Sequence, residues 1–170
     1  MNIDWKSEIA KMVYIHQAIS KLDVTKLWDH KLPRKSADLC DITKAEEELS
    51  ITLPIDYKEF LKHANGWPCF YQYVDLFGCM DYLGSKEFRT ACDSLKLLPI
   101  SKLQRDNLLP IAATSDDIDL FCLNLSTHKV IWYAGGEIEQ FSSFSEFFLS
   151  MMDYNRREYR KLLQESGATS

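Results

Sequence analysis

The sequence lacks the cysteine patterns of a zinc site or a disulfide framework. Its five cysteines are irregularly spaced, no two form a CxxC pair, and none has zinc-finger spacing to any of the four histidines. An odd number of cysteines without a pairing pattern indicates reduced thiols, and we expect most of them to be buried as small apolar residues. No cysteine is singled out as a nucleophile beside a histidine.

Long apolar runs are also missing. The run LFCL at 120–123 is far too short to cross a bilayer. The opening residues MNIDWKSEIAKMVYIHQ carry charge through their first turns and lack the apolar core of a signal peptide. We therefore expect a cytoplasmic protein that does not bind membranes.

A glycine-rich phosphate loop is absent, because the YAGGE segment at 133–137 is typical of a hairpin turn. We predict neither a cofactor nor a metal. What the chain does have is 170 residues, of which 46% are apolar and 12% aromatic, so we expect one well-packed domain.

Charge is unevenly distributed along the chain. Residues 1–35 carry +3 and residues 153–170 carry +1, whereas residues 36–152 carry −9. An acidic region of this size repels nucleic acid and attracts basic partners, although acidic surfaces also occur simply because they favour solubility.

Helical periodicity predicts an amphipathic helix over residues 4–20, followed by a polar connection at 29–41. Asp4 is a candidate N-cap, and apolar residues recur along one face. That face carries Trp5, Ile9, Met12, Val13, His16 and Ile19. We divide the chain into this N-terminal segment at 1–41, a main unit at 42–152 and a charged helical extension at 153–170.

A second helix is predicted to begin at Thr43, because Thr43 and Glu46 have the spacing of a capping box. The adjacent glutamates Glu46, Glu47 and Glu48 point about 100° apart on a helix and cannot converge on a ligand. A solvated helix face is the better interpretation.

The stretch LPIDYKEFLKHANGW at 53–67 has the signals of a third helix. Pro54 fits the first turn, one apolar stripe follows, and Asn65-Gly66 tolerates the left-handed conformation that ends a helix. We interpret this stretch as structural framework, with the following key residues: Leu53, Pro54, Tyr57, Phe60, Leu61, Asn65 and Gly66.

Beyond Gly66 the pattern favours strands. WPCFYQYVDLFG indicates a loop entering a strand at 73–77, residues 85–97 indicate a short helix, and 108–112 an extended segment. Three strands then follow at about 118–126, 129–134 and 137–141 with tight turns, before a final helix that Ser143 and Glu146 cap. The fold class is α+β, with an antiparallel meander packed against helices in a single domain.

These elements together resemble the SUKH superfamily, the Smi/Knr-type domain. The resemblance rests on ITKAEEELSITLPIDYKEFLKHANGW at 42–67, LLPIA at 108–112, SDDIDLFCLNL at 115–125 and FSSFSEFFLSMM at 141–152. Trp67 and the turn Ser115-Asp116-Asp117 depart from the small residues and glycines that the family often has there.

The resemblance implies a non-enzymatic α+β domain that acts by binding. Many bacterial members resemble immunity proteins that neutralise toxins, frequently nucleases, and fungal relatives serve as regulatory scaffolds. We therefore expect a protein partner, a basic toxin domain in the first instance, with a scaffold role as the alternative. Fold alone does not decide between these roles.

Candidate partner-binding residues are aromatic or acidic, since aromatic residues dominate interface energies and carboxylates attract basic partners. They are Trp67, Tyr71, Asp75, Asp116, Asp117, Asp119, Glu137 and Glu139, with Phe70, Tyr73 and Trp132 as further aromatic candidates. Trp67, next to Pro68, is the ring we most expect at the surface. A metal-dependent hydrolase that uses the cluster Asp116, Asp117 and Asp119 is a third and weaker hypothesis, because no EF-hand pattern is present.

Overall fold

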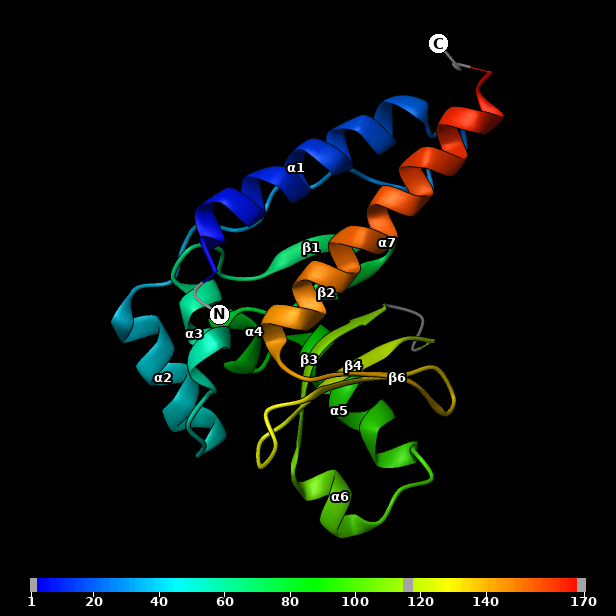
Figure 1. The fold of residues 1–170 in the computed structure, drawn as a ribbon. Helices are drawn as coiled ribbons and strands as arrows, with labels where there is room; N and C mark the ends of the chain where they lie inside the picture. The colour runs from blue at the N-terminus through cyan, green and yellow to red at the C-terminus, as the bar shows by residue number, and fades with distance from the viewer. Residues whose placement is uncertain (1–2, 115–117, 168–170) are drawn as a thin grey trace.

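Six strands follow one another as an antiparallel meander, and each pairs with its neighbours in the sequence (Figure 1). The computed structural model describes residues 3–114 and 118–167. The strands are β1 (Trp67–Tyr71), β2 (Val74–Leu76), β3 (Leu108–Thr114), β4 (Leu120–Asn124), β5 (Val130–Tyr133) and β6 (Glu137–Phe141). The predicted α+β fold with a meander in a single domain is confirmed.

Seven helices in the described part of the chain surround this sheet. They are α1 (Trp5–Leu22), α2 (Leu39–Leu49), α3 (Ile55–Leu61), α4 (Cys79–Tyr82), α5 (Lys86–Leu97), α6 (Lys102–Asp106) and α7 (Phe144–Glu165). None of these described helices combines the length and the apolar character that crossing a bilayer requires.

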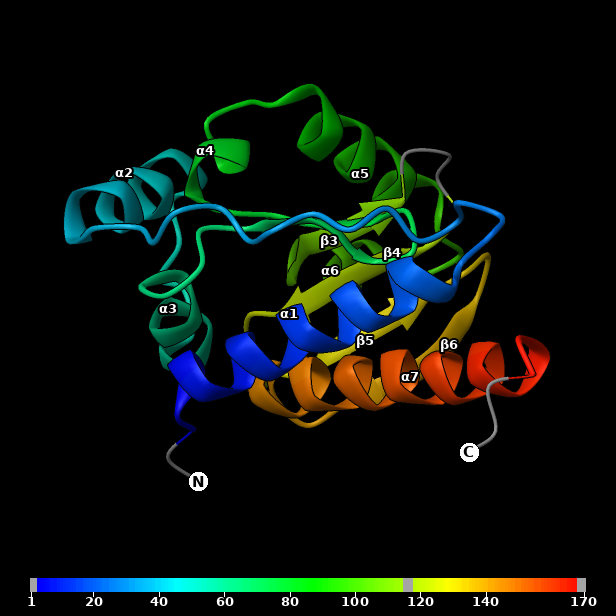
Figure 2. The ribbon, with the colours of Figure 1, turned by 90° about the horizontal axis from the view of Figure 1, so that it is seen from above.

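Helices cover both faces of the sheet, as Figure 2 shows with α5 on one side and α1 and α7 on the other. On the α7 side, Phe147 packs against Phe121 of β4 and Phe141 of β6, with ring centroids 5.3 Å and 5.5 Å apart. On the other side, Phe88 of α5 meets Phe77, which follows β2, at 5.9 Å. Because both faces are covered, four of the five β4 residues are buried.

The N-terminal helix α1 is part of this core. Asp4 caps it by accepting a hydrogen bond from the Ser7 amide, as predicted. Trp5 meets Phe60 of α3 at 5.4 Å and Phe148 of α7 at 5.3 Å, both edge to face. The predicted apolar face is largely buried, so α1 packs along α7 and closes one side of the molecule.

The predicted start of the second helix is wrong. Helix α2 begins at Leu39, where Asp38 and Asp41 form a reciprocal capping box. Thr43 lies inside the helix, and its hydroxyl donates to the Leu39 carbonyl oxygen. Glu46 stabilises the next connection instead, since its carboxylate accepts from the Leu53 amide and from Lys58 Nζ.

The stripe predicted for the third helix is buried, because Tyr57, Phe60, Leu61 and Ala64 all have 0% exposure. The ends of this helix differ from the prediction. Pro54 is its N-cap, and the helix stops at Leu61, four positions before the turn at 65–66. The final helix α7 has the predicted Ser143 cap, which accepts from the Glu146 amide, but the Glu146 carboxylate accepts from the Ser142 amide and not from that of Ser143.

Candidate partner-binding surface

Three aromatic rings from distant segments meet at the surface. Tyr71 ends β1, Trp132 lies on β5, and Tyr154 lies halfway along α7. Their ring centroids are 6.2 to 6.5 Å apart in all three pairs. All three side chains are partly exposed, so the triangle presents aromatic area to solvent while it remains packed.

Buried aromatic residues support these rings from below. Phe121 of β4 stacks against Trp132 with a centroid distance of 5.0 Å and an interplanar angle of 26°. Trp28, from the connection after α1, meets the Tyr71 ring edge to face at 5.5 Å and is itself buried. Rings held in this way lose little conformational entropy when a partner covers them.

Carboxylates accept hydrogen bonds from two of the three rings. Trp132 Nε1 donates to Asp119 Oδ1 at 2.7 Å, and the Tyr154 hydroxyl donates to Glu139 Oε2 at 2.5 Å. The hydrogen bond to Glu139, together with burial, raises the pKa of Tyr154 to about 12. Burial, with the charges of Glu158 and Asp119, also raises the pKa of Tyr71.

We call this region the aromatic–acidic surface. It consists of Tyr71, Trp132, Tyr154, Asp119, Glu139 and Glu158. It brings together four of the predicted binding residues, Tyr71, Trp132, Asp119 and Glu139. Tyr154 and Glu158 were not predicted, because they lie in a helix segment whose charged composition indicates only a solvated extension.

Trp67 is not a surface residue, so the prediction that it is exposed is wrong. It is the first residue of β1, has 0% exposure, and donates from Nε1 to the Lys31 carbonyl oxygen at 2.9 Å. Its ring packs against Phe70 and His16. The connection after α1 covers it, and this explains how a tryptophan beside a proline is enclosed.

The remaining predicted binding residues lie apart from the aromatic–acidic surface or outside the described residues. Glu137 is exposed on the edge strand β6, where its carboxylate accepts from Gln140 Nε2. Asp75 Oδ1 accepts from the Cys69 amide across the β1–β2 hairpin, and burial raises the pKa of this half-buried carboxyl. Asp116 and Asp117 lie outside the described residues.

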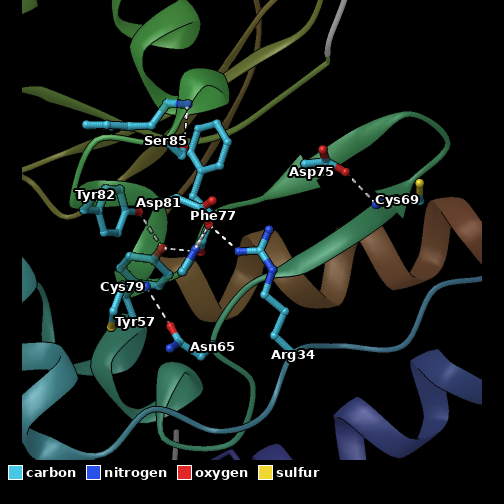
Figure 3. A network of polar contacts seen from close by, with 12 residues as sticks. Arg34, Tyr57, Asn65, Cys69, Asp75, Phe77, Cys79, Asp81, Tyr82 and Ser85 are labelled. Atoms are coloured by element: carbon cyan, nitrogen blue, oxygen red, sulfur yellow. Dashed lines mark hydrogen bonds and ion pairs between the residues drawn. The ribbon is translucent and has the colours of Figure 1, made fainter.

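A buried polar network ties the N-terminal connection to the main unit (Figure 3). The Asp81 carboxylate, which is 5% exposed, accepts from Arg34 Nη1 and from the Gly78 amide. Nearby, the Tyr57 hydroxyl donates to the Phe77 carbonyl oxygen at 2.9 Å and lies 2.6 Å from the Tyr82 hydroxyl. Each group is paired within the framework, so this network has a structural role.

The cysteines do not form a site among the described residues. All five are free thiols, and no three His, Cys, Asp or Glu side chains in the described ranges 3–114 and 118–167 are placed to hold a metal. Only Cys79 and Cys122 are buried, so the expectation that most cysteines are buried is wrong. Burial raises the pKa of Cys79 to about 12, which keeps that thiol protonated.

One hollow, of about 610 Å³, carries residue types found in hydrolytic triads. It lies beside the end of α1, and Ser20, Asp23 and His30 are among the residues that line it. Ser20 Oγ donates to the Gln17 carbonyl oxygen, and the Asp23 carboxylate accepts from the Thr25 residue and the Trp28 amide. The serine and aspartate are therefore hydrogen-bonded to neighbouring residues of the chain and not to the histidine.

The chain is thus an antiparallel α+β domain with a supported aromatic patch beside two carboxylates. The model of the SMI1 / KNR4 family (SUKH-1) matches residues 36–150, which is more than half of the chain. The chain therefore belongs to the SMI1/KNR4 family (SUKH-1). A search of curated proteins found none that matches it.

Proposed function

We propose that this chain is a non-enzymatic immunity protein that neutralises a basic toxin by tight association in the cytoplasm. The observation that carries the proposal is the aromatic–acidic surface, where three partly exposed rings meet and two carboxylates bind them. Interface energy concentrates in aromatic residues that are rigid before binding, and carboxylates accelerate the encounter with a basic partner. Membership of the SMI1/KNR4 family, whose bacterial members include immunity proteins, supports the same role.

A toxin that acts on nucleic acid suits this surface well. Such an enzyme needs a basic surface to hold phosphates, and an acidic protein can occupy that surface in place of the substrate. The charge of −9 on residues 36–152 supplies a long-range field of the required sign.

The test is affinity capture of the tagged full-length chain from its own host, with bound proteins identified by mass spectrometry. We expect one basic polypeptide that is toxic when expressed alone and harmless when co-expressed with this chain. Capture of signalling or envelope-synthesis proteins without any toxic one would contradict the immunity role and favour a regulatory scaffold.

A further inference from the structure

Asp119 and Glu139 each have one carboxylate oxygen engaged at the aromatic–acidic surface. Each uses one carboxylate oxygen to fix a ring of the surface, since Oδ1 accepts from Trp132 and Oε2 accepts from Tyr154. Within the described residues, the second oxygen of each carboxylate has no hydrogen-bond donor. Two partly exposed carboxylates therefore keep acceptor capacity beside the exposed aromatic rings.

An arginine of the chain itself already contacts one ring of this surface. The Arg157 guanidinium lies over the Tyr154 ring, with its carbon 5.3 Å from the ring centroid. This distance is within the range of a cation–π interaction. The Tyr71 and Trp132 rings lie 6.4 and 6.2 Å from Tyr154, so further aromatic area adjoins the ring that Arg157 occupies.

The chemistry of the surface favours arginine over the other residues a partner can present. A guanidinium is planar, stacks on aromatic rings and donates in a fork to carboxylates, whereas a lysine ammonium is a strongly hydrated point charge. An apolar side chain would cover Asp119 and Glu139 without supplying donors, and this carries a desolvation cost.

We infer that the aromatic–acidic surface is an arginine-recognition site for the protein partner. A guanidinium from the partner stacks on one of the Tyr71 and Trp132 rings, whose planes are 78° apart, and donates to the open carboxylate oxygens of Asp119 and Glu139. This inference rests on the proposed function for the identity of the partner. It adds which side chain of the partner is recognised and where.

The test uses hexa-arginine and hexa-lysine peptides with the full-length, ¹⁵N-labelled chain at low salt. The Trp132 indole N–H signal reports on the site directly, because that group donates to Asp119. We expect hexa-arginine to shift this signal and to bind about tenfold more tightly than hexa-lysine, since stacking and forked donation are available to arginine alone. Equal affinities for the two peptides, or an unmoved indole signal, would overturn the inference.

A charge-removing variant distinguishes this site from general electrostatic attraction. Asp119→Asn with Glu139→Gln keeps a side-chain oxygen that accepts from Trp132 and Tyr154, so the rings stay in place. The matched control, Glu47→Gln with Glu48→Gln, removes the same charge from exposed positions on α2. We expect the first variant to lose arginine selectivity and the control to keep it. Equal losses in both variants would contradict a localised site.

The peptide experiment and the toxin capture test different proposals, so either proposal can be refuted while the other stands. A wild-type chain that shows no preference for hexa-arginine, with a toxin still captured and neutralised, would refute only this inference. Selective arginine binding without a toxin partner would refute only the immunity role.

Discussion

Phe60 connects three helices through its side chain. It packs against Trp5 of α1 and against Phe144 and Phe148 of α7, and its exposure is 0%. We predict that Phe60→Ala lowers the free energy of unfolding by about 3–5 kcal/mol, because the lost contacts leave a cavity. Urea unfolding measures this change. Ile55→Ala on the same helix is the control, since Ile55 is 67% exposed, and equal losses would mean that the buried face of α3 is wrongly assigned.

His16 makes the stability of the chain depend on pH. Burial and the nearby His30 lower its pKa from 6.5 to about 4, against a backbone hydrogen bond to Phe70 that raises it. Between pH 6.5 and about pH 4, His16 is protonated in the unfolded chain but neutral in the folded chain. The free energy of unfolding therefore falls as the pH falls through this range. We predict a loss of about 2 kcal/mol from this group between pH 7 and pH 5.

The measurement is the free energy of unfolding at both pH values for wild type, His16→Gln and His63→Gln. His63 is exposed on the turn after α3 and serves as the control. His16→Gln is expected to reduce the pH dependence, and His63→Gln to retain it. An identical pH dependence in wild type and His16→Gln would be inconsistent with this account.

Two candidate N-caps, Asp38 and Thr43, could set the start of helix α2, and the structure uses Asp38. Asp38 and Asp41 satisfy each other's backbone amides, whereas Thr43 bonds the Leu39 carbonyl oxygen inside the helix. We predict that Asp38→Ala costs about 0.5–2 kcal/mol of stability. Thr43→Ala is expected to cost less than about 0.5 kcal/mol, as for an ordinary surface change. Thermal unfolding compares the stability of the two variants. A larger loss of stability for Thr43→Ala would mean that the helix begins at Thr43, as the sequence predicted.

The contact between the end of α3 and the start of α4 depends on Gly78. A Cβ at Gly78 would lie 2.2 Å from the Asn65 carbonyl oxygen, and the Asn65 side chain accepts from the Cys79 amide at 2.6 Å. We predict that Gly78→Ala costs at least about 1–3 kcal/mol, because backbone atoms must move apart. Gly136→Ala is the control, since nothing lies within 4 Å of its added Cβ. Similar melting temperatures for both variants would contradict this packing.

Hydrophobic periodicity predicted the elements whose apolar residues keep a regular spacing. It missed elements in which that spacing is interrupted or in which two capping patterns are possible. The spacing of Tyr57, Phe60 and Leu61 is enough to place the buried face of α3. Strand β1 was missed because Pro68 and the left-handed Cys69 interrupt its alternation, and its Trp67 packs beneath a connection that comes from elsewhere in the sequence. The start of α2 was missed because Thr43 and Glu46 match the capping-box pattern better than the pair of aspartates that forms it.

At the scale of the whole molecule, the candidate site could be predicted only in part. Residue chemistry identified Tyr71, Trp132, Asp119 and Glu139 separately, but their meeting depends on how the sheet curls and how α7 crosses it. Asn155 and Met151 are buried on the adjacent face of α7, and this orients Tyr154 toward the sheet. The charged composition of this segment gives no sign of that orientation. These segments are distant in the sequence, and only the folded topology brings them together.

We propose that a basic partner binds through the aromatic–acidic surface. The most direct test is the dissociation constant of the captured partner for wild type, for Asp119→Asn with Glu139→Gln, and for the control pair Glu47→Gln with Glu48→Gln. We predict that the first variant weakens binding by about tenfold or more, since it removes charges at a desolvated contact, and that the control pair stays close to wild type. An unchanged dissociation constant for the first variant would contradict the account and place the interface elsewhere on the molecule.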